Sequence, residues 1–272
     1  MPSLPPFFGR VLAAAFVAVA LGPPTRAQFT WTTGTIPQTS FASAQTLTIS
    51  STNNHDFGGT EISNCGTVDW TGGNLRSGSA GSFTNNNIFN DSASGTTTVQ
   101  FNNGLGGAVT FTNAVGATYT KTATGTTTFS GVAFDNSGAV AVTAGTLSLN
   151  GGGSAAATGS FAVSPGATLN FGGGTSTLAS GTSFTGAGTF GLSGGTLSIS
   201  AGTATLSNLT VNGGTLAGAG AASLGTLTQS SGAIGINALT LTGIGSTWTG
   251  GCQPNGSAGP RPNRARTFAG AL

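Results

Sequence analysis

Charge is the scarcest property of this 272-residue sequence. Only 4% of its residues are Asp, Glu, Lys or Arg, and none of these occurs from Asn136 to Pro260. The formal net charge of +2 arises near the two ends, because the body from Gln28 to Gly250 carries only Arg76 and Lys121 against all five acids. Nucleic-acid binding needs a basic stripe that displaces counterions from phosphates. The body has no such stripe, and we predict no nucleic-acid partner.

Side chains for acid–base chemistry and metal binding are also few. Glycan hydrolysis, a common use of β-helices, needs two carboxylates at the scissile bond. The chain has five acids and one His, and the only cluster is His55, Asp56 and Glu61 in HDFGGTE. One His cannot form a zinc site alone, and Cys65 is not part of a C-x-x-C pair. The sequence therefore predicts no catalytic residue and no metal ligand.

A dinucleotide cofactor is excluded by context. The segment GAGTFG, residues 186–191, matches G-x-G-x-x-G letter for letter. That motif requires a following helix and an acidic residue about 20 positions later, and no acid follows Asp135. We expect no cofactor and a protein that is not an enzyme.

Helical periodicity is missing after residue 27, and short strands replace it. Pro165 is the only proline between Pro37 and Pro254, as expected where strands have neighbours on both sides. Apolar residues alternate with Thr, Ser or Ala, which is the period of a strand. Pairs of this kind are Val109 and Phe111, Val140 and Val142, Leu147 and Leu149, Leu169 and Phe171, Leu197 and Ile199, and Leu239 and Leu241.

These strands recur with a period of about 20 residues, a length found in solenoid repeats. The sequence Gly-Thr-apolar begins at Gly145, Gly188, Gly195, Gly214 and Gly225, with the variant GATL at Gly166. Such a repeat predicts an all-β fold, a parallel β-helix or β-solenoid with about 20 residues per coil, in which each coil buries its apolar side chains against its neighbours. About 220 residues would give on the order of 11 coils at a spacing of about 4.8 Å.

Two other structures are compatible with the composition. The 48 Gly residues and 10 Pro residues could indicate disorder, but 17 Phe residues and regularly spaced apolar side chains favour a folded chain. A β-sandwich or barrel is the other all-β alternative. It would have longer strands and would leave the repeating Gly unexplained.

The two ends of the chain differ from the body. Residues 1–27 read as a signal peptide, with Arg10 before the apolar run VLAAAFVAVAL and cleavage expected near Ala27. We expect an N-terminal capping or irregular β region over 28–64, solenoid repeats over 65–250, and a disordered or aberrant tail over 251–272. The tail carries three Pro and three Arg and does not resemble a capping coil. No segment of the mature chain is long enough to span a membrane as a helix.

The two cysteines, Cys65 and Cys252, invite a disulfide in an exported chain. In the predicted rod their separation in the sequence would place them about 9 coils apart, on the order of 45 Å. A disulfide needs its Cα atoms within about 7 Å. We therefore expect these two cysteines not to pair with each other.

The repeats resemble a known group of proteins. AGTLSLNGGG, the run SPGATLNFGGGTSTLASGTSFTGAGTFGLSGGTLSI, VNGGTLAGAGAASLGTLTQSSG and STWTGG are similar to repeats of large secreted bacterial proteins with haemagglutinin-like or autotransporter-passenger β-helices. The resemblance covers about residues 65–250 and implies a right-handed parallel β-helix displayed outside the cell and used in adhesion. The sequence departs from autotransporters after Gly250, where no strands of a membrane barrel follow.

Three functions follow as hypotheses. The first is a secreted or cell-surface structural or adhesin-like solenoid that contacts a host, matrix or glycan surface and associates end to end through uncapped strands. The second is a carbohydrate-active β-helix enzyme, which requires Asp56, Glu61, Asp69 and Asp91 to converge in a groove. The third is an ice-binding solenoid with outward Thr rows. It rests on the Thr-x-Thr segments around Leu47, Phe111, Tyr119, Leu227 and Leu241.

Overall fold

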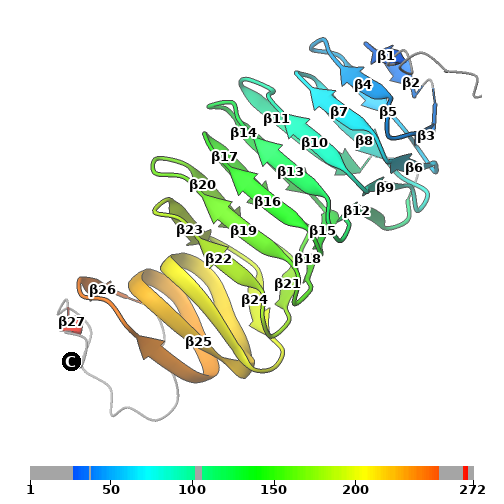
Figure 1. Ribbon diagram of the computed structural model, residues 1–272. Coiled ribbons are helices and arrows are strands. Elements are labelled where there is room, and N and C mark those ends of the chain that lie inside the picture. Colours follow the sequence, from blue (N-terminus) through cyan, green and yellow to red (C-terminus); the bar gives the residue numbers. More distant parts are fainter. Residues whose placement is uncertain (1–26, 37, 102–105, 251–265, 269–272) are drawn as a thin grey trace, which may run out of the picture.

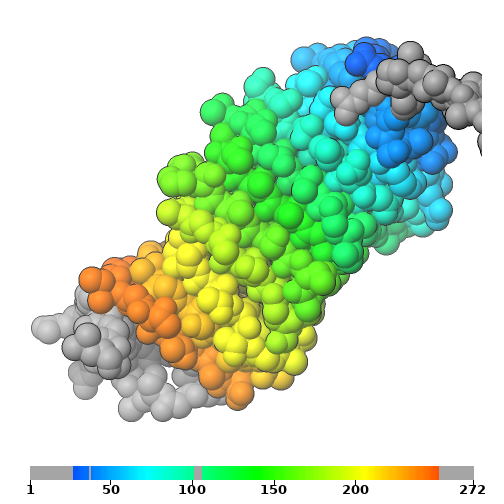
Figure 2. Space-filling model, in the orientation of Figure 1, coloured from blue at the N-terminus to red at the C-terminus, as the bar shows by residue number. Residues whose placement is uncertain are grey.

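The computed structural model describes residues 27–36, 38–101, 106–250 and 266–268. This part of the chain contains 27 strands and no helix. The strands stack along one axis into a rod, and Figure 1 shows the N-terminal strands at one end and the C-terminal strands at the other. In Figure 2 the colours follow one another along the rod as bands, so each coil contacts the coils next to it in sequence. The predicted all-β solenoid is confirmed.

Three strands make one coil, because each strand from β1 to β22 pairs in parallel with the strand three places further along the chain. The coils therefore build three sheets, which we name faces A, B and C. Face A consists of β1 (Gln28–Trp31), β4 (Thr46–Ile49), β7 (Thr67–Trp70), β10 (Ile88–Asp91), β13 (Thr118–Lys121), β16 (Ala139–Val142), β19 (Ser160–Val163) and β22 (Ser183–Thr185).

Face B follows face A within each coil. It consists of β2 (Gly34–Thr35), β5 (Asn54–Asp56), β8 (Asn74–Ser77), β11 (Thr96–Phe101), β14 (Thr126–Ser130), β17 (Thr146–Leu149), β20 (Thr168–Phe171) and β23 (Thr189–Leu192). Face C completes the coil. It consists of β3 (Ser40–Phe41), β6 (Glu61–Asn64), β9 (Ser82–Asn85), β12 (Val109–Asn113), β15 (Val132–Asn136), β18 (Gly153–Ala155), β21 (Thr175–Leu178) and β24 (Thr196–Ile199).

The register of the sheets gives the length of a coil. The structure has about 10 turns of roughly 21 residues each, close to the predicted spacing. Thr46 lies opposite Thr67, and Ala139 lies opposite Ser160, with this separation in both pairs. The widest step leads from Ile88 to Thr118 on face A. Face B shows the same widening, because the contacting residues Thr97 and Thr127 are 30 positions apart. The additional residues belong to the coil that contains β11.

The Gly-Thr signal marks strand starts on two different faces. Gly145 and Gly188 precede the first residues of β17 and β23 on face B, whereas Gly195 precedes β24 on face C. The signal therefore recurs evenly at 145, 166 and 188 and less evenly afterwards. Gly145 has a φ of +67°, and a Cβ there would lie 2.3 Å from the carbonyl oxygen of Gly125 in the previous coil. The corner needs glycine for both its backbone conformation and its close approach.

The interior of the coils is filled by the alternate side chains of every face. Strands such as β7 and β20 alternate between half-buried and buried positions, so one row of each strand points inward. On face C the rings of Phe83, Phe111 and Phe134 stack in successive coils with centroids 5.4 and 5.3 Å apart. Stacked coils thus bury a continuous apolar column, which is the source of stability expected for a solenoid.

The last coils are more tightly wound. β25 (Thr203–Leu241) is a single strand of 39 residues, and Figure 1 shows it turning around the rod axis. Its first part pairs with β22, β23 and β24. Just after it, the backbone amide of Thr242 donates to the carbonyl of Leu224 at 2.8 Å, across a sequence separation of 18. β26 (Ser246–Trp248) pairs in parallel with β25 and antiparallel with β27 (Arg266–Phe268).

The expected end regions are described only in part. The expected signal peptide, residues 1–27, lies outside the described residues apart from Ala27, and so does the expected tail apart from β27. The region 28–64, expected to be capping or irregular, contains β1 to β6, which pair with β4 to β9 in the same parallel order as the later coils. Among the described residues there is no helix with the length and hydropathy needed to cross a bilayer.

Candidate functional site

The cluster His55, Asp56 and Glu61 is divided by the fold. His55 points inward and is fully buried, with its Nε2 3.2 Å from the carbonyl oxygen of Ser50. Asp56, the next residue on β5, points outward and forms a bidentate ion pair with Arg76 of the next coil, with both N–O distances at 2.8 Å. Glu61 begins β6 on face C and is exposed. These three side chains therefore do not form one site.

Asp69 and Asp91 are also separated from these acids. On the outer surface of face A, the amide of Asn90 donates to Asp69 at 2.8 Å, whereas Asp91 points into the interior and is fully buried. Asp56, Glu61 and Asp69 thus lie on three different faces and Asp91 inside the coil. These four carboxylates do not meet in a groove, which was the condition for the enzyme hypothesis. Within the described residues no group of three metal-ligating side chains occurs.

Cys65 is exposed and forms no disulfide among the described residues. Cys252 lies outside them, so the expected lack of pairing between the two cysteines stays a prediction.

An asparagine ladder runs through the interior at the end of face C. Asn64, Asn85, Asn113 and Asn136 occupy the same position in four successive coils and are fully buried or nearly so. The side-chain amide of each of the first three donates to the Oδ1 of the next, at 2.8, 2.9 and 2.9 Å. Amide ladders of this kind accompany stacked parallel strands.

The ladder also fixes the corner between faces C and A. The amide of Asn85 donates a second hydrogen bond to the carbonyl of Thr118, and that of Asn113 donates to Ala139, at 2.9 and 3.1 Å. The Oδ1 of Asn136 accepts from the backbone amide of Gly138 at 3.2 Å. Sequence reasoning missed this ladder. The sequence signal for it was an Asn two residues after an Ile or a Phe, in the segments ISN, FTN, FTN and FDN.

A second buried polar group lies where face A meets face B. Asp91 and Lys121 are register partners on β10 and β13, and both side chains are fully buried. The Lys121 Nζ lies 3.8 Å from the Asp91 Oδ1. The Tyr119 hydroxyl donates to the Asp91 Oδ2 at 2.8 Å. Thr127, which also stabilises the carboxylate, shares a hydrogen bond of 3.1 Å with Thr97.

Burial dominates the proton affinities in this group. Desolvation raises the pKa of Asp91 above its ordinary value, although the charge of Lys121 and hydrogen bonds from Thr127, Tyr119 and the Ala93 amide oppose the shift. Desolvation and the neighbouring Asp91 also raise the pKa of Tyr119 well above its usual value. Since a buried carboxylate lacks solvation, the interior favours the neutral acid.

The outer surface of face B carries an aligned row of threonines. Thr96, Thr126, Thr146, Thr168 and Thr189 lie opposite one another in five successive coils. We call these five residues the threonine row. All five are exposed or half-buried. In the neighbouring outward column the Asn170 amide donates at 3.1 Å to the hydroxyl of Ser148, which is buried.

The Thr-x-Thr segments named from the sequence do not build this array. Those around Leu47 and Tyr119 lie on β4 and β13 of face A, three coils apart, whereas that around Phe111 lies on face C. The segments around Leu227 and Leu241 belong to the region of β25. The alignment of threonines depends on which strands become neighbours. The threonine row consists of the first residues of successive face B strands, and none of the predicted Thr-x-Thr segments contributes to it.

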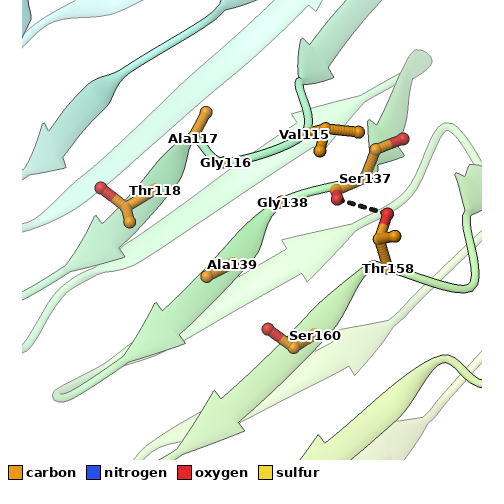
Figure 3. Close-up of a pocket in the computed structure, with 9 residues that line it drawn as sticks. All are labelled: Val115, Gly116, Ala117, Thr118, Ser137, Gly138, Ala139, Thr158 and Ser160. Carbon is orange, nitrogen blue, oxygen red and sulfur yellow. Dashed lines mark hydrogen bonds between the residues drawn. The ribbon is translucent and has the colours of Figure 1, made fainter.

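Two depressions lie at the corners of the rod. One, of about 320 Å³, lies where face C turns into face A over three coils, and Figure 3 shows its lining of small side chains. There the Thr158 hydroxyl donates to the carbonyl of Ser137 at 2.8 Å. The other, of about 330 Å³, lies at the turn into face B and includes Thr96 and Thr97. Neither is lined by a titratable side chain, so their chemistry is that of hydroxyl, amide and backbone groups.

Comparisons with protein-family models, with curated proteins and with solved structures found no match.

Proposed function

We propose that this protein is a non-enzymatic extracellular or cell-surface solenoid with a structural or adhesin-like role, and that face B contacts a glycan surface. The observation that carries the proposal is the threonine row, which repeats one hydroxyl per coil over five coils. Adjacent strands lie about 4.8 Å apart. A polymer laid along the rod would therefore meet equally spaced hydroxyl groups that donate and accept hydrogen bonds.

The lack of charged side chains on face B supports a neutral ligand. The last four coils with threonine-row residues have no charged side chain in their face B strands, because the sequences of β14, β17, β20 and β23 contain no Asp, Glu, Lys or Arg. Binding by such a surface would rest on hydrogen bonds and shape rather than on ion pairs. Affinity should accordingly change little with salt, since screening acts on charges.

Binding to insoluble polysaccharides, cellulose and chitin, tests the proposal. The variant Thr126→Ala/Thr146→Ala/Thr168→Ala removes three hydroxyls of the row. Its matched control is Thr175→Ala/Thr196→Ala/Thr215→Ala, which removes three aligned hydroxyls from face C. We expect the first variant to weaken retention at least about tenfold, or about 1.4 kcal/mol, and the control to leave it unchanged. Failure of the unaltered protein to bind either polysaccharide, or equal loss in both variants, would overturn this assignment.

Export is the second part of the proposal, supported by the leader-like sequence that ends near Ala27. The mature protein is expected in the medium or on the cell surface with Gln28 as its first residue. N-terminal sequencing of the secreted chain measures this directly. An uncleaved chain retained in the cytoplasm would contradict it. The resemblance to secreted bacterial haemagglutinin-like and autotransporter-passenger repeats supports the same location.

The ice-binding alternative rests on the same row, because a regular array of threonine hydroxyls and methyl groups on a flat sheet can order water. Thermal hysteresis of the purified mature chain distinguishes it from glycan binding. Hysteresis that disappears in the face B variant and persists in the face C variant would favour ice. Absence of hysteresis at high protein concentration would eliminate that alternative and leave the glycan proposal standing.

A further inference from the structure

The buried pair of Asp91 and Lys121 interrupts an otherwise apolar column. The same inward position on face A is held by Trp31, Ile49 and Trp70 in the earlier coils and by Val142 and Val163 in the later ones. Both charged side chains have no solvent exposure, and the Lys121 Nζ has no hydrogen-bond partner in the described part of the chain.

A charged ammonium group buried at this position is energetically unfavourable. Burial of an ion pair costs more than its attraction returns unless hydrogen bonds satisfy the remaining protons, and at 3.8 Å the Lys121 Nζ is beyond hydrogen-bond distance of the carboxylate. Transfer of the proton would leave a neutral amine beside a neutral carboxylic acid. These are the two species that react to form an amide, and both are held in a site shielded from solvent.

We propose that Lys121 and Asp91 form an intramolecular isopeptide bond that covalently joins β10 to β13. The lone pair of the neutral Nζ attacks the Asp91 Cγ, and an Nζ–Cγ bond forms. The Cγ–Oδ1 bond then breaks, and Oδ1 leaves as water with its own proton and one proton from Nζ. The product is an amide with one N–H. No oxidant or co-reactant is required, because the reaction only condenses a carboxylic acid with an amine.

Tyr119 is the group placed to assist the reaction. Its hydroxyl donates to Oδ2 at 2.8 Å, and Oδ2 is the oxygen that carries negative charge in the tetrahedral intermediate and becomes the amide carbonyl. A donor already aimed at that oxygen stabilises the charge as it develops. The ring of Tyr119 is held by stacking on Phe89, with centroids 5.2 Å apart. The remaining oxygen, Oδ1, is the one that faces Lys121 in the ion pair.

The position of the bond in the fold gives it a consequence. The pairing of β10 with β13 spans the longest coil among the described residues. A covalent bond between these register partners would keep the two coils joined even if the longer coil between them moved. Cross-links stabilise mainly by restricting the unfolded chain, and the effect grows with the length of the closed loop. This inference concerns the interior and does not depend on the proposed glycan binding.

Mass spectrometry of the folded full chain tests the proposal. We expect the protein to be lighter than its sequence by one water, and proteolysis to release a branched peptide that joins the segments around Asp91 and Lys121. Lys121→Met should have its full sequence mass. Asp91→Asn should be lighter by one ammonia, because the amide nitrogen then leaves instead of the hydroxyl oxygen. Tyr119→Phe, which keeps the ring, should reduce the fraction cross-linked at a fixed time after refolding.

The decisive measurement is made on the unaltered protein, so misfolding of a variant does not weaken the test. A folded unaltered chain with its full sequence mass and no branched peptide would overturn the proposal. A loss of water that maps to other residues would do the same. A loss of water already complete in denaturant, before the coils form, would also contradict it, because the reaction depends on the folded site.

Discussion

The coils before and after residue 136 share one architecture but differ in what they bury. The earlier coils contain every charged residue of the body, the asparagine ladder, the Asp91–Lys121 pair and the stacked rings of Phe83, Phe111 and Phe134. The later coils bury mainly aliphatic side chains, such as Leu197 and Leu216, although they also contain one stacked pair of rings, Phe161 and Phe184, with centroids 5.0 Å apart. They end in the 39-residue strand β25. The solenoid therefore needs inward side chains that align from coil to coil. Its interior can contain polar and aromatic side chains or mainly aliphatic ones.

Corner structure is the second difference between the two regions. In the earlier coils the buried amides bind corner backbone groups, and the step from Asn64 to Asn85 is 21. In the later coils the equivalent column passes from Asn136 to Ala155 and Leu178. The steps in this column are 19 and 23 and lie on either side of that value. We interpret the ladder as a device that satisfies the backbone groups of its corner, because the buried amides supply hydrogen-bond partners that these groups would otherwise lack.

The largest expected effect is the loss of an aromatic ring from the earlier coils. Phe111→Ala removes a ring that contacts Phe83 and Phe134 in the adjacent coils, and we expect it to lower the free energy of unfolding by about 3–5 kcal/mol. Leu197→Ala in the later coils should cost about 2–5 kcal/mol by the same mechanism. Urea denaturation measures both. A cost below about 1 kcal/mol for Phe111→Ala, less than a packed ring should show, would mean that the rings are not a packed column.

The next effect concerns the ladder itself. Asn113→Ala removes the donor to Asn136 and Ala139 and the acceptor for Asn85. We expect a loss of about 1–3 kcal/mol, the usual cost of unsatisfied buried polar groups. Asn86→Ala is the control, because the Asn86 side chain is exposed and donates to Ser63 on the surface. Equal midpoints of urea unfolding for the two variants would remove the distinction between ladder and surface asparagines.

The pH dependence of stability sharpens the contrast at Asp91. In Lys121→Met no isopeptide bond can form and the opposing charge is gone, so the pKa of Asp91 stays raised by burial. A raised pKa means that the folded chain binds the proton more tightly than the unfolded chain. Stability is then greatest below about pH 4 and falls as pH rises toward the folded pKa, by at most about 1.4 kcal/mol per pH unit.

The reference for that experiment is Lys121→Met/Asp91→Asn, which lacks the titrating carboxyl. Its urea midpoint, measured from pH 3 to pH 8, gives the background of all other groups. The single variant should lose stability relative to the double variant as pH rises. A relative gain in stability over the same range would contradict the raised pKa.

The smallest effect is expected on the outer surface. Thr146→Ala should change the free energy of unfolding by no more than about 0.5 kcal/mol, as is usual for surface positions, although the threonine row is proposed to bind a ligand. Thermal unfolding monitored by circular dichroism measures this. A substantially larger loss would assign the row a structural role and remove the reason for treating it as a binding surface.

The fold can be predicted from the sequence because its signals are local. The alternation in Leu147 and Leu149 identifies a strand, and the glycine before Thr146 identifies its start. The parallel pairing and a coil of roughly 21 residues then follow from the repeat. The region 28–64 has weaker repeats, which suggest an irregular structure, yet its strands join the same sheets.

The polar features could not be obtained in the same way, because they depend on alignment between coils. Asn85 and Asn113 are separated by 28 in the sequence and meet only because β9 and β12 pair across the widened coil. Thr126 and Thr146 come together because β14 pairs with β17, whereas the predicted Thr-x-Thr segments fall on different faces. A residue inserted at a corner changes such alignments without altering any strand pattern.

The central claim is that successive coils pair in parallel at the register described, and paired cysteines test it most directly. Thr120 and Ala141 are outward register partners on β13 and β16, so their Cα atoms lie about 4.8 Å apart, within the range for a disulfide. In a chain with Cys65→Ser and Cys252→Ser, we expect Thr120→Cys/Ala141→Cys to form a disulfide on mild oxidation. Thr120→Cys/Ala162→Cys, which spans two coils, should remain reduced. Peptide mapping that finds the second pair bonded, or the first pair unbonded, would contradict the solenoid.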